Sequence, residues 1–446
     1  MFAKSKITLP LLALPLLFGA AIGLHADFFA LDPGVRGDPA GAGGPIDGIS
    51  DNERKFFEAG LVAFTEIQDV QGDDPGLGPR FNLDNCAGCH AQPAVGGSSP
   101  FKNPQVEVAT KANARNVVPF FVRIDGPVRE ARFKFKPDGT RDGGVHALFT
   151  ITGRDDAPGC VLAQPDFATA AAQNNLVFRI PTPAFGAGLI QAVDEGTILA
   201  NKRSQPLRKQ FFGIAGRENR NGNDGTITRF GWKAQNKSLL IFAGEAYNVE
   251  QGVTNELFPQ ERDETPECHF NGTPEDQTRF DQTEPSAVPS DTAKFAIFMR
   301  FLAPPTPAGE TPSISNGRSL FNKIGCALCH TPSLTTGKSS NAAFDQKPVN
   351  LFSDLLLHNM GPELADNILQ GNARGDEFRT APLWGLGQRK FFLHDGRTTD
   401  LREAIMAHRS FGNLQFGSSE ANLVIQVFDA LGGADTQDIF NFLRSL

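Results

Sequence analysis

The sequence predicts a mainly α-helical protein made of two similar domains that arose by internal duplication. The first observation behind this prediction is a five-residue motif, CAGCH at 86–90, which returns as CALCH at 326–330. The second is that three other segments recur in the same order around each copy. The third is a proline-rich segment, APPTPAGETP at 303–312, which separates the two sets.

Each half is expected to open and close with a helix. The closing segments carry apolar residues at the spacing of one helical face, and we expect Asp291 and Asp435 to cap them. The resulting domains are residues 27–303 and 314–446, joined by a linker at 304–313. The recurring pairs are GLVAF (60–64) with GRSLF (317–321), FRIPTPAFGAG (178–188) with FRTAPLWGLG (378–387), and DTAKFAIFMRFL (291–302) with DTQDIFNFLRSL (435–446).

The N-terminal domain is the longer one, because an insertion follows its CAGCH motif. Two alternating apolar runs in this insertion, PFFVRIDGPV (119–128) and HALFTITG (146–153), predict short strands or hairpins. We therefore expect a β-containing insertion on a helical domain.

The first 26 residues predict export. Lys4 and Lys6 precede a short apolar segment at 9–22, and small residues follow it up to Ala26. This order is typical of a signal peptide, and the apolar segment is short for a membrane-spanning helix, although an uncleaved anchor is the alternative. We expect the mature protein in the periplasm without a stable membrane anchor. The net charge of −8 and the lack of a basic block argue against a nucleic-acid partner.

The repeated motif predicts covalently bound haem. Two thiols separated by two residues reach the two vinyl groups of a porphyrin, and the adjacent histidine binds the iron. Zinc is the alternative, but a zinc ribbon needs two such cysteine pairs close in sequence. Each domain would then be a cytochrome c-like helical cradle around one haem. The predicted cofactors are two haem c groups, one held by Cys86, Cys89 and His90, the other by Cys326, Cys329 and His330.

Cys160 and Cys268 are the two remaining cysteines. Because oxidising compartments favour disulfides, we expect these residues to form one that closes a large loop. Two free thiols are the alternative.

The sixth ligand of each iron decides whether the haem carries electrons or binds a small oxidant. For the second haem we expect His408, with Met360 as the alternative. The segment TTDLREAIMAH predicts a helix that begins at Thr399 or Asp400, and His408 shares one face of it with three apolar residues. A buried iron on that face would take the imidazole as ligand.

The first haem has fewer candidate ligands. No methionine lies between Met1 and Met299, and we expect Met299 in the core of the closing helix. After the predicted signal peptide, the other histidines of this half are His146 and His269. Either one of them binds the first iron or the sixth position is open or weakly filled, which would make the first haem the reactive one.

Three segments of the C-terminal half resemble those of the bacterial di-haem cytochrome c peroxidase superfamily, most closely its "thiol oxidoreductase-like" branch. They are HNMG (358–361), FRTAPLWGLG (378–387) and FLHDGRTTDLREAI (392–405). The resemblance implies a small-molecule oxidant such as peroxide at the first haem, with electrons relayed from the second. It also implies a small redox protein, a cytochrome or a cupredoxin, as electron donor. Calcium between the domains occurs in the resembling enzymes, although no acidic loop for it stands out in this sequence.

The resemblance also proposes individual residues. RFGWKA (229–234) is similar to the family's segment with a tryptophan between the haems, which implies Trp232. NVEQG (248–252) is similar to the segment with the catalytic glutamate, which implies Glu250 as acid–base catalyst.

Two further expectations concern the second haem. His408 stands where the resembling peroxidases have methionine, and a histidine ligand lowers the potential of the haem. We expect Arg379 or Arg397 to pair with a haem propionate. Together these features predict a periplasmic di-haem c-type oxidoreductase, and the alternative is a non-catalytic di-haem electron-transfer protein.

Overall fold

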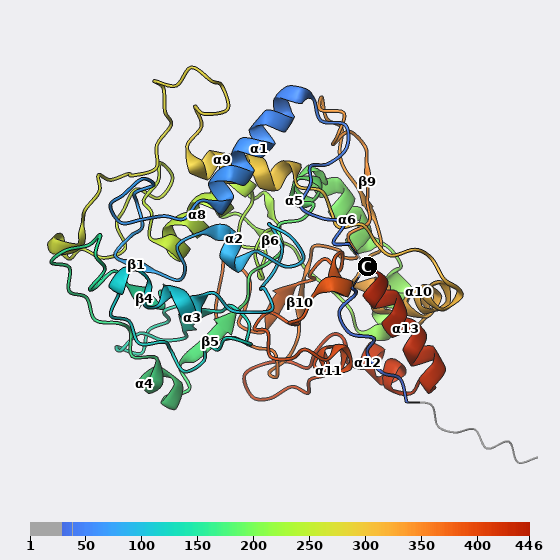
Figure 1. Cartoon of the computed structure of the whole chain (residues 1–446). Helices are drawn as coiled ribbons and strands as arrows, with labels where there is room; N and C mark the ends of the chain where they lie inside the picture. The colour runs from blue at the N-terminus through green and yellow to red at the C-terminus, as the bar shows by residue number, and fades with distance from the viewer. Residues whose placement is uncertain (1–28, 38) are drawn as a thin grey trace, which may run out of the picture.

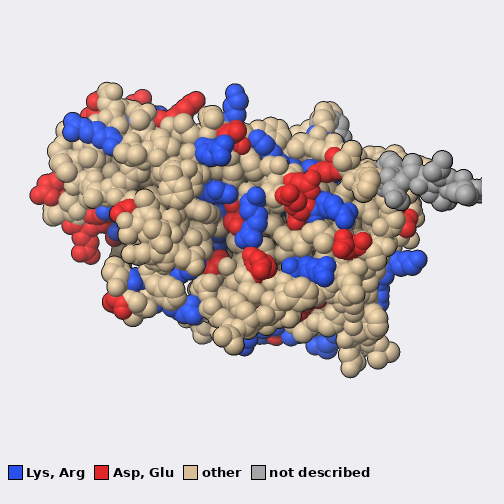
Figure 2. Space-filling view, turned by 90° about the horizontal axis from the view of Figure 1, so that it is seen from below, with Lys and Arg blue, Asp and Glu red and all other residues tan. Residues whose placement is uncertain are grey.

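The computed structural model describes residues 29–37 and 39–446, and Figure 1 shows how the elements are arranged. The predicted signal peptide lies outside the described residues. Within the described part of the chain, no helix is both long enough and apolar enough to cross a membrane. On the face that Figure 2 shows, acidic and basic side chains are interspersed, and this face carries no broad basic surface.

Helices open and close each half, as the sequence predicts, and the two cysteine motifs fall on α2 and on the 3₁₀ turn η3. The N-terminal half contains α1 (Asp51–Thr65), α2 (Cys86–Cys89), α3 (Gln105–Val108), η1 (Lys111–Asn113), α4 (Phe167–Ala172), α5 (Ala187–Ala192), α6 (Glu195–Arg203), α7 (Pro206–Phe212), α8 (Leu239–Gln251), η2 (Pro266–Cys268) and α9 (Asp291–Phe301). The C-terminal half contains α10 (Pro312–Ile324), η3 (Cys326–Leu328), η4 (Leu386–Gln388), α11 (Leu401–Met406), α12 (Asn422–Asp429) and α13 (Gly433–Ser445).

The strands are short and form small separate sheets. The three-stranded sheet has β2 (Glu130–Phe133) between β3 (Val145–His146) and β5 (Leu176–Arg179), antiparallel to both. The other strands pair in twos, namely β1 (Arg80–Phe81) with β4 (Phe149–Thr150), β6 (Asn219–Arg220) with β7 (Ile227–Thr228), β8 (Leu334–Thr335) with β9 (Pro348–Val349), and β10 (Leu357–Asn359) with β11 (Glu377–Arg379).

One of the two runs expected to form strands in the insertion does so. The run at 146–153 contains β4 and the end of β3. The expectation for 119–128 is wrong, because turns occupy this run, and β2 begins only at Glu130. Pro119 and Pro127 lack the backbone N–H that a sheet ladder requires, which explains the turn.

The opening and closing helices pack in a similar way in the two halves, α1 against α9 and α10 against α13 (Figure 1). Each contact contains a glycine of the opening helix. A Cβ on Gly60 would lie 2.5 Å from a backbone carbonyl oxygen of α9 and 2.9 Å from Cβ of Phe298. A Cβ on Gly317 would lie 1.9 Å from a backbone carbonyl oxygen of α13 and 2.8 Å from Cβ of Phe442. Phe298 and Phe442 occupy the same position of the two closing segments.

A second pair of glycines makes matching contacts with the closing helices. A Cβ on Gly188 would lie 1.9 Å from the carbonyl oxygen of Arg300, and a Cβ on Gly387 would lie 2.0 Å from that of Arg444. Arg300 and Arg444 again occupy the same position of the two closing segments. The two halves therefore use the same close backbone approaches at corresponding places.

The predicted N-caps of the closing helices are wrong by one residue or more. Ser290 caps α9, because its hydroxyl oxygen accepts a hydrogen bond from the backbone N of Ala293, and Asp291 is the first helical residue. Gly432 precedes α13, so Asp435 lies within the first turn. Both carboxylates still lie at the positive end of a helix dipole.

Buried charges join the two halves. Arg179 of β5 and Lys233 both contact Asp366 of the C-terminal half, at N–O distances of 2.6 and 3.0 Å. At most 3% of each of these side chains is exposed, so water screens the attraction little. The predicted disulfide between Cys160 and Cys268 is present and buried, and it ties the insertion to η2.

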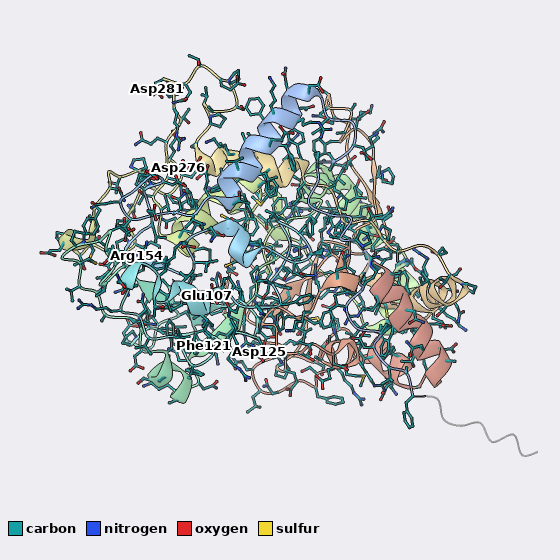
Figure 3. All side chains as sticks on the ribbon, in the orientation of Figure 1. Glu107, Phe121, Asp125, Arg154, Asp276 and Asp281 are labelled. Atoms are coloured by element: carbon teal, nitrogen blue, oxygen red, sulfur yellow. A yellow bond between two sulfur atoms is a disulfide. The ribbon has the colours of Figure 1, made fainter. Side chains whose placement is uncertain are left out.

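Carboxylates crowd around the N-terminal end of α9, where Figure 3 labels Asp276. Asp276 accepts a hydrogen bond from the backbone N of Asp291 at 2.7 Å. Burial, with repulsion from Asp276, raises the pKa of Glu275 to about 7. Burial and neighbouring carboxylates likewise raise the pKa of Asp74 to about 6. The cluster therefore opposes folding when all its members are ionised.

Replacing Glu275 by Gln is expected to stabilise the protein at pH 8 but not at pH 4. The folded-state pKa of Glu275 lies above its unfolded value of about 4.3, so the wild type loses stability as pH rises through about 7. The expected gain in Tm at pH 8 is on the order of 1–2 °C. Thermal unfolding at the two pH values measures it, with exposed Glu284→Gln as control. The same Tm change at both pH values would contradict the expectation.

Candidate functional site

The first C-x-x-C-H motif opens into a pocket with about 1170 Å³ of space between its side chains. Phe64 of α1, Tyr247 of α8 and Phe295 of α9 line it together with the motif, so the opening and closing helices form part of its wall. β2 and α8 add charged side chains. The pocket is mainly apolar around the motif and polar on the side of β2 and of the end of α8.

The thiols and histidine of this motif fit covalent haem attachment. Cys86 and Cys89 are not bonded to each other, and both line the pocket. Burial raises the pKa of Cys86 to about 12, which argues against a free reactive thiolate. His90 donates from Nδ1 to the carbonyl oxygen of Gly97 at 3.0 Å, a bond that fixes its ring as in many metal-binding histidines.

Two glutamates meet in the polar part of the first pocket. Glu250, at the end of α8, accepts a hydrogen bond from Nδ2 of Asn82 at 2.7 Å. Burial, followed by repulsion from Glu130, raises the pKa of Glu250 well above its ordinary value. Glu130 itself pairs with Arg132 at 2.5 Å. The structure thus places Glu250 in the first pocket. Glu130 and Arg132 line the same pocket, and the sequence analysis did not identify these two residues.

The candidate sixth ligands of the first iron are not equally placed. His146 stacks on Phe133 and bonds to Asp142, and His269 bonds to the carbonyl oxygen of Asp263; neither lines the first pocket. Met299 does line it, although the sequence places it simply in the core. Apart from His90, no described histidine lines this pocket.

The second motif opens into a larger pocket, with about 1560 Å³ of space. His330 and His408 both line it. His330 donates from Nδ1 to the carbonyl oxygen of Phe352 at 3.0 Å, and His408 donates from Nδ1 to that of Ala404 at 2.9 Å. These bonds leave both Nε2 atoms without a proton. Burial and then the charge that His408 can carry lower the pKa of His330 to about 4, and both rings line the same pocket.

The helix expected before His408 begins at Asp400, whose side chain accepts from the backbone N of Glu403. It ends at Met406, two residues before His408, yet His408 lines the pocket while Met406 does not. Met360, the alternative ligand, lines the same pocket. His358 also lines it, but its two ring nitrogens already contact Asp354 and Glu420 at 2.9 and 2.8 Å.

Replacing His408 by Ala is expected to convert the second haem from low spin to high spin, because the imidazole expected as sixth ligand is lost. Electron paramagnetic resonance and the visible spectrum of the holoprotein measure the change. Met360→Leu is the matched control and should leave the second haem low spin. An unchanged spectrum in the His408 variant, with a change in the Met360 variant, would transfer the ligand role to Met360.

Trp232 lies between the two pockets and lines both. Its Nε1 donates to the carbonyl oxygen of Ile180 at 2.9 Å, and its ring meets that of His394 edge to face at 6.3 Å. Ile180 and Pro181 also line both pockets. The shared wall is therefore one residue thick at these positions.

Buried arginines in the second pocket fit an anionic group such as a haem propionate. Arg379 and Arg389 line both this pocket and a smaller cavity of about 550 Å³ beside Trp232. Burial, with repulsion from Arg389, lowers the pKa of Arg379 to about 10. Burial alone lowers the pKa of Arg389 to about 10. No described residue accepts a hydrogen bond from its guanidinium or forms a salt bridge with it.

Arg397, the other expected propionate partner, does not line the second pocket. Its side chain is 39% exposed, pairs with Asp395 at 2.7 Å and donates to the carbonyl oxygen of Glu363. Arg389 therefore takes its place among the candidates. No group of three or more described His, Cys, Asp or Glu side chains is placed to hold a further metal ion, and calcium stays a prediction.

These features define a class, a haem protein with two cofactor pockets that share a wall. Residues 130–446 match the model of a family described as "Di-haem oxidoreductase, putative peroxidase". The match spans more than half of the chain. The chain therefore belongs to this family of peroxidase-like di-haem oxidoreductases.

Other comparisons add no further argument. The similar solved structures include hydrazine synthase of Kuenenia stuttgartiensis (15% identity, 60% of this chain and 88% of that chain, TM-score 0.28) and a MauG-like protein associated with microbial copper homeostasis (17%, 60% and 90%, 0.32). They also include the diheme peroxidase BthA from Burkholderia thailandensis E264 (15%, 71% and 94%, 0.31). No curated protein matched the chain.

Proposed function

We propose that the protein is a periplasmic di-haem c-type oxidoreductase that reduces peroxide, or another small oxidant, at its first haem. Electrons reach the first haem from the second, which a small cytochrome or cupredoxin reduces. We also propose that both haems are bound covalently, through Cys86 and Cys89 and through Cys326 and Cys329. The matching glycine contacts support an origin of the halves by duplication, with domains at 27–303 and 314–446.

The observation that carries this proposal is the difference between the two pockets. His330 and His408 both line the second pocket, and His408 shifts the pKa of His330, which supports one iron bound between the two rings. Among the described residues, His90 is the one histidine that lines the first pocket, and the polar part of this pocket contains Glu250 and Glu130. An iron with both axial positions filled suits electron storage, whereas a vacant position beside a proton donor suits small-molecule chemistry.

The haems supply the redox chemistry, in which peroxide takes up two electrons and two protons and leaves as two waters. The protein contributes the surroundings. Glu250 exchanges protons with the oxidant, and Asn82 holds its carboxyl in place. Trp232 joins the two pockets, and Arg379 with Arg389 neutralises the propionates of the second haem.

Met299 supports a second candidate function. A thioether in the wall of the first pocket could fill the sixth position and make the protein a di-haem electron carrier. Met299→Leu distinguishes the two functions, because it changes the spectrum of the first haem only if the sulfur binds the iron.

The test is carbon monoxide binding to the half-reduced holoprotein, combined with reduction of hydrogen peroxide by a reduced donor protein. The proposed function predicts one carbon monoxide per two haems and catalytic turnover. Two low-spin haems that bind no carbon monoxide at any reduction level would rule out the proposed function and support the di-haem electron carrier. The pyridine haemochrome spectrum of the denatured protein tests covalent attachment in the same sample.

A further inference from the structure

Glu130 and Glu250 reach the first pocket from different parts of the chain. Glu130 begins β2 in the insertion, opposite Arg179 of β5, and Glu250 lies in the last turn of α8. Both carboxyl groups line the first pocket, and each shifts the pKa of the other, so the two groups lie within reach of one shared proton. Asn82 binds Glu250 through its side chain and also donates from its backbone N to the carbonyl oxygen of Glu250 at 2.7 Å.

The charges around the pair decide which glutamate carries the proton. Burial opposes the charge of Glu130, but Arg132, Glu250 and Arg179 together outweigh burial, and the pKa of Glu130 lies below its ordinary value. Glu250 forms no salt bridge with any described residue, and burial and then Glu130 raise its pKa. Arg179 faces Glu130 from β5. The pair therefore keeps one proton, on Glu250, across a wide range of pH.

Three other groups face the pair. Arg262 follows α8, donates to the carbonyl oxygens of Val249 and Val145, and lies near both carboxyl groups. The sulfur atoms of Cys86 and Cys89 lie on the side of the haem motif, near Glu250. Thioether bonds would leave these sulfur atoms uncharged, so the pH dependence of the pair rests on the carboxyl groups and the arginines.

We propose that Glu130 is a positioning residue for Glu250, and that the two share one proton so that the pair offers an acid and a base to the oxidant together. The inference rests on the proposed function. One oxygen of the pair takes the proton of the bound peroxide while Glu250 gives its proton to the departing oxygen. The number of protons on the pair is then the same before and after, and solvent supplies the two protons that the waters need.

A Glu130→Gln variant removes the charge that holds the proton on Glu250. The Glu250 carboxyl should then lose its proton at a pH at least one unit lower than in the wild type. Glu130→Asp keeps the charge and should retain most of the wild-type value, and it serves if the Gln variant fails to fold. Glu245→Gln is the matched control, because Glu245 lines the same pocket and accepts a hydrogen bond from Asn236.

Infrared difference spectra of the holoprotein measure this directly. At pH 8, above the pKa of about 7 of Glu275, the wild type should show a protonated carboxyl band that Glu250→Gln removes. The pH at which the band disappears should be lower in Glu130→Gln than in the wild type, and it should be the same in Glu245→Gln as in the wild type. A band that titrates at the wild-type pH in Glu130→Gln, or no band at pH 8, would overturn the proposal.

The pH profile of kcat/KM for peroxide separates this inference from the function on which it rests. Its alkaline limb should move with the infrared band in Glu130→Gln. If the infrared band shows the shared proton but the protein does not turn over peroxide, the proposed function is refuted and the pairing of Glu130 with Glu250 still holds. Turnover with an unmoved band and limb would refute the pairing alone.

Discussion

Replacing Glu250 by Gln is expected to slow peroxide reduction by about 10²- to 10⁴-fold while the two haem spectra stay as they are. Glutamine keeps the size of the side chain and can still bond to Asn82, but it neither accepts nor donates the proton that O–O cleavage requires. Stopped-flow mixing of the half-reduced variant with hydrogen peroxide measures the rate.

The control for this variant is Glu245→Gln in the same pocket, which should react within a few-fold of the wild type. Carbon monoxide binding should be equal in all three proteins, since no iron ligand changes. If the Glu250 variant reacts at the wild-type rate, the acid–base role belongs elsewhere in the first pocket.

Replacing Gly317 by Ala is expected to cost about 1–3 kcal/mol of unfolding free energy and to lower the yield of holoprotein. The new Cβ would lie 1.9 Å from a backbone carbonyl oxygen of α13, and a backbone atom cannot move aside as a flexible side chain can. Chemical denaturation of the holoprotein, followed at the haem absorption and by circular dichroism, measures the loss.

Gly309→Ala in the linker is the matched control, because a Cβ there has no atom within 4 Å. It should leave the midpoint of denaturation unchanged. Equal stability of the two variants would mean that the α10–α13 contact can open without cost, against the close approach that the structure shows.

The sequence was informative where the chemistry is local. Each C-x-x-C-H motif brings three candidate haem-binding residues together within five positions, and the structure places these residues in the walls of the two pockets. The pocket wall that contains His408 also contains the apolar residues with which the sequence grouped it by helical spacing, although α11 ends at Met406, before His408, and its role as ligand stays a prediction. The opening and closing helices follow from the same periodicity.

What the sequence did not reveal depends on long-range packing. Glu130 and Arg132 come from the insertion and reach the first pocket only because β2 pairs with β5. Arg389 has no motif that sets it apart, and only the folded chain shows its guanidinium without a partner in the second pocket. Arg397 was misplaced because its neighbour Asp395 holds it toward solvent.

The wall formed by Ile180, Pro181 and Trp232 faces both pockets. A substitution there cannot be confined to one redox centre, since the same atoms set the dielectric surroundings of the two. Separate tuning of the two haems requires residues that line one pocket alone, such as Met299 for the first and Met360 or Ile405 for the second. We therefore expect a substitution in this shared wall to shift the midpoint potentials of both haems.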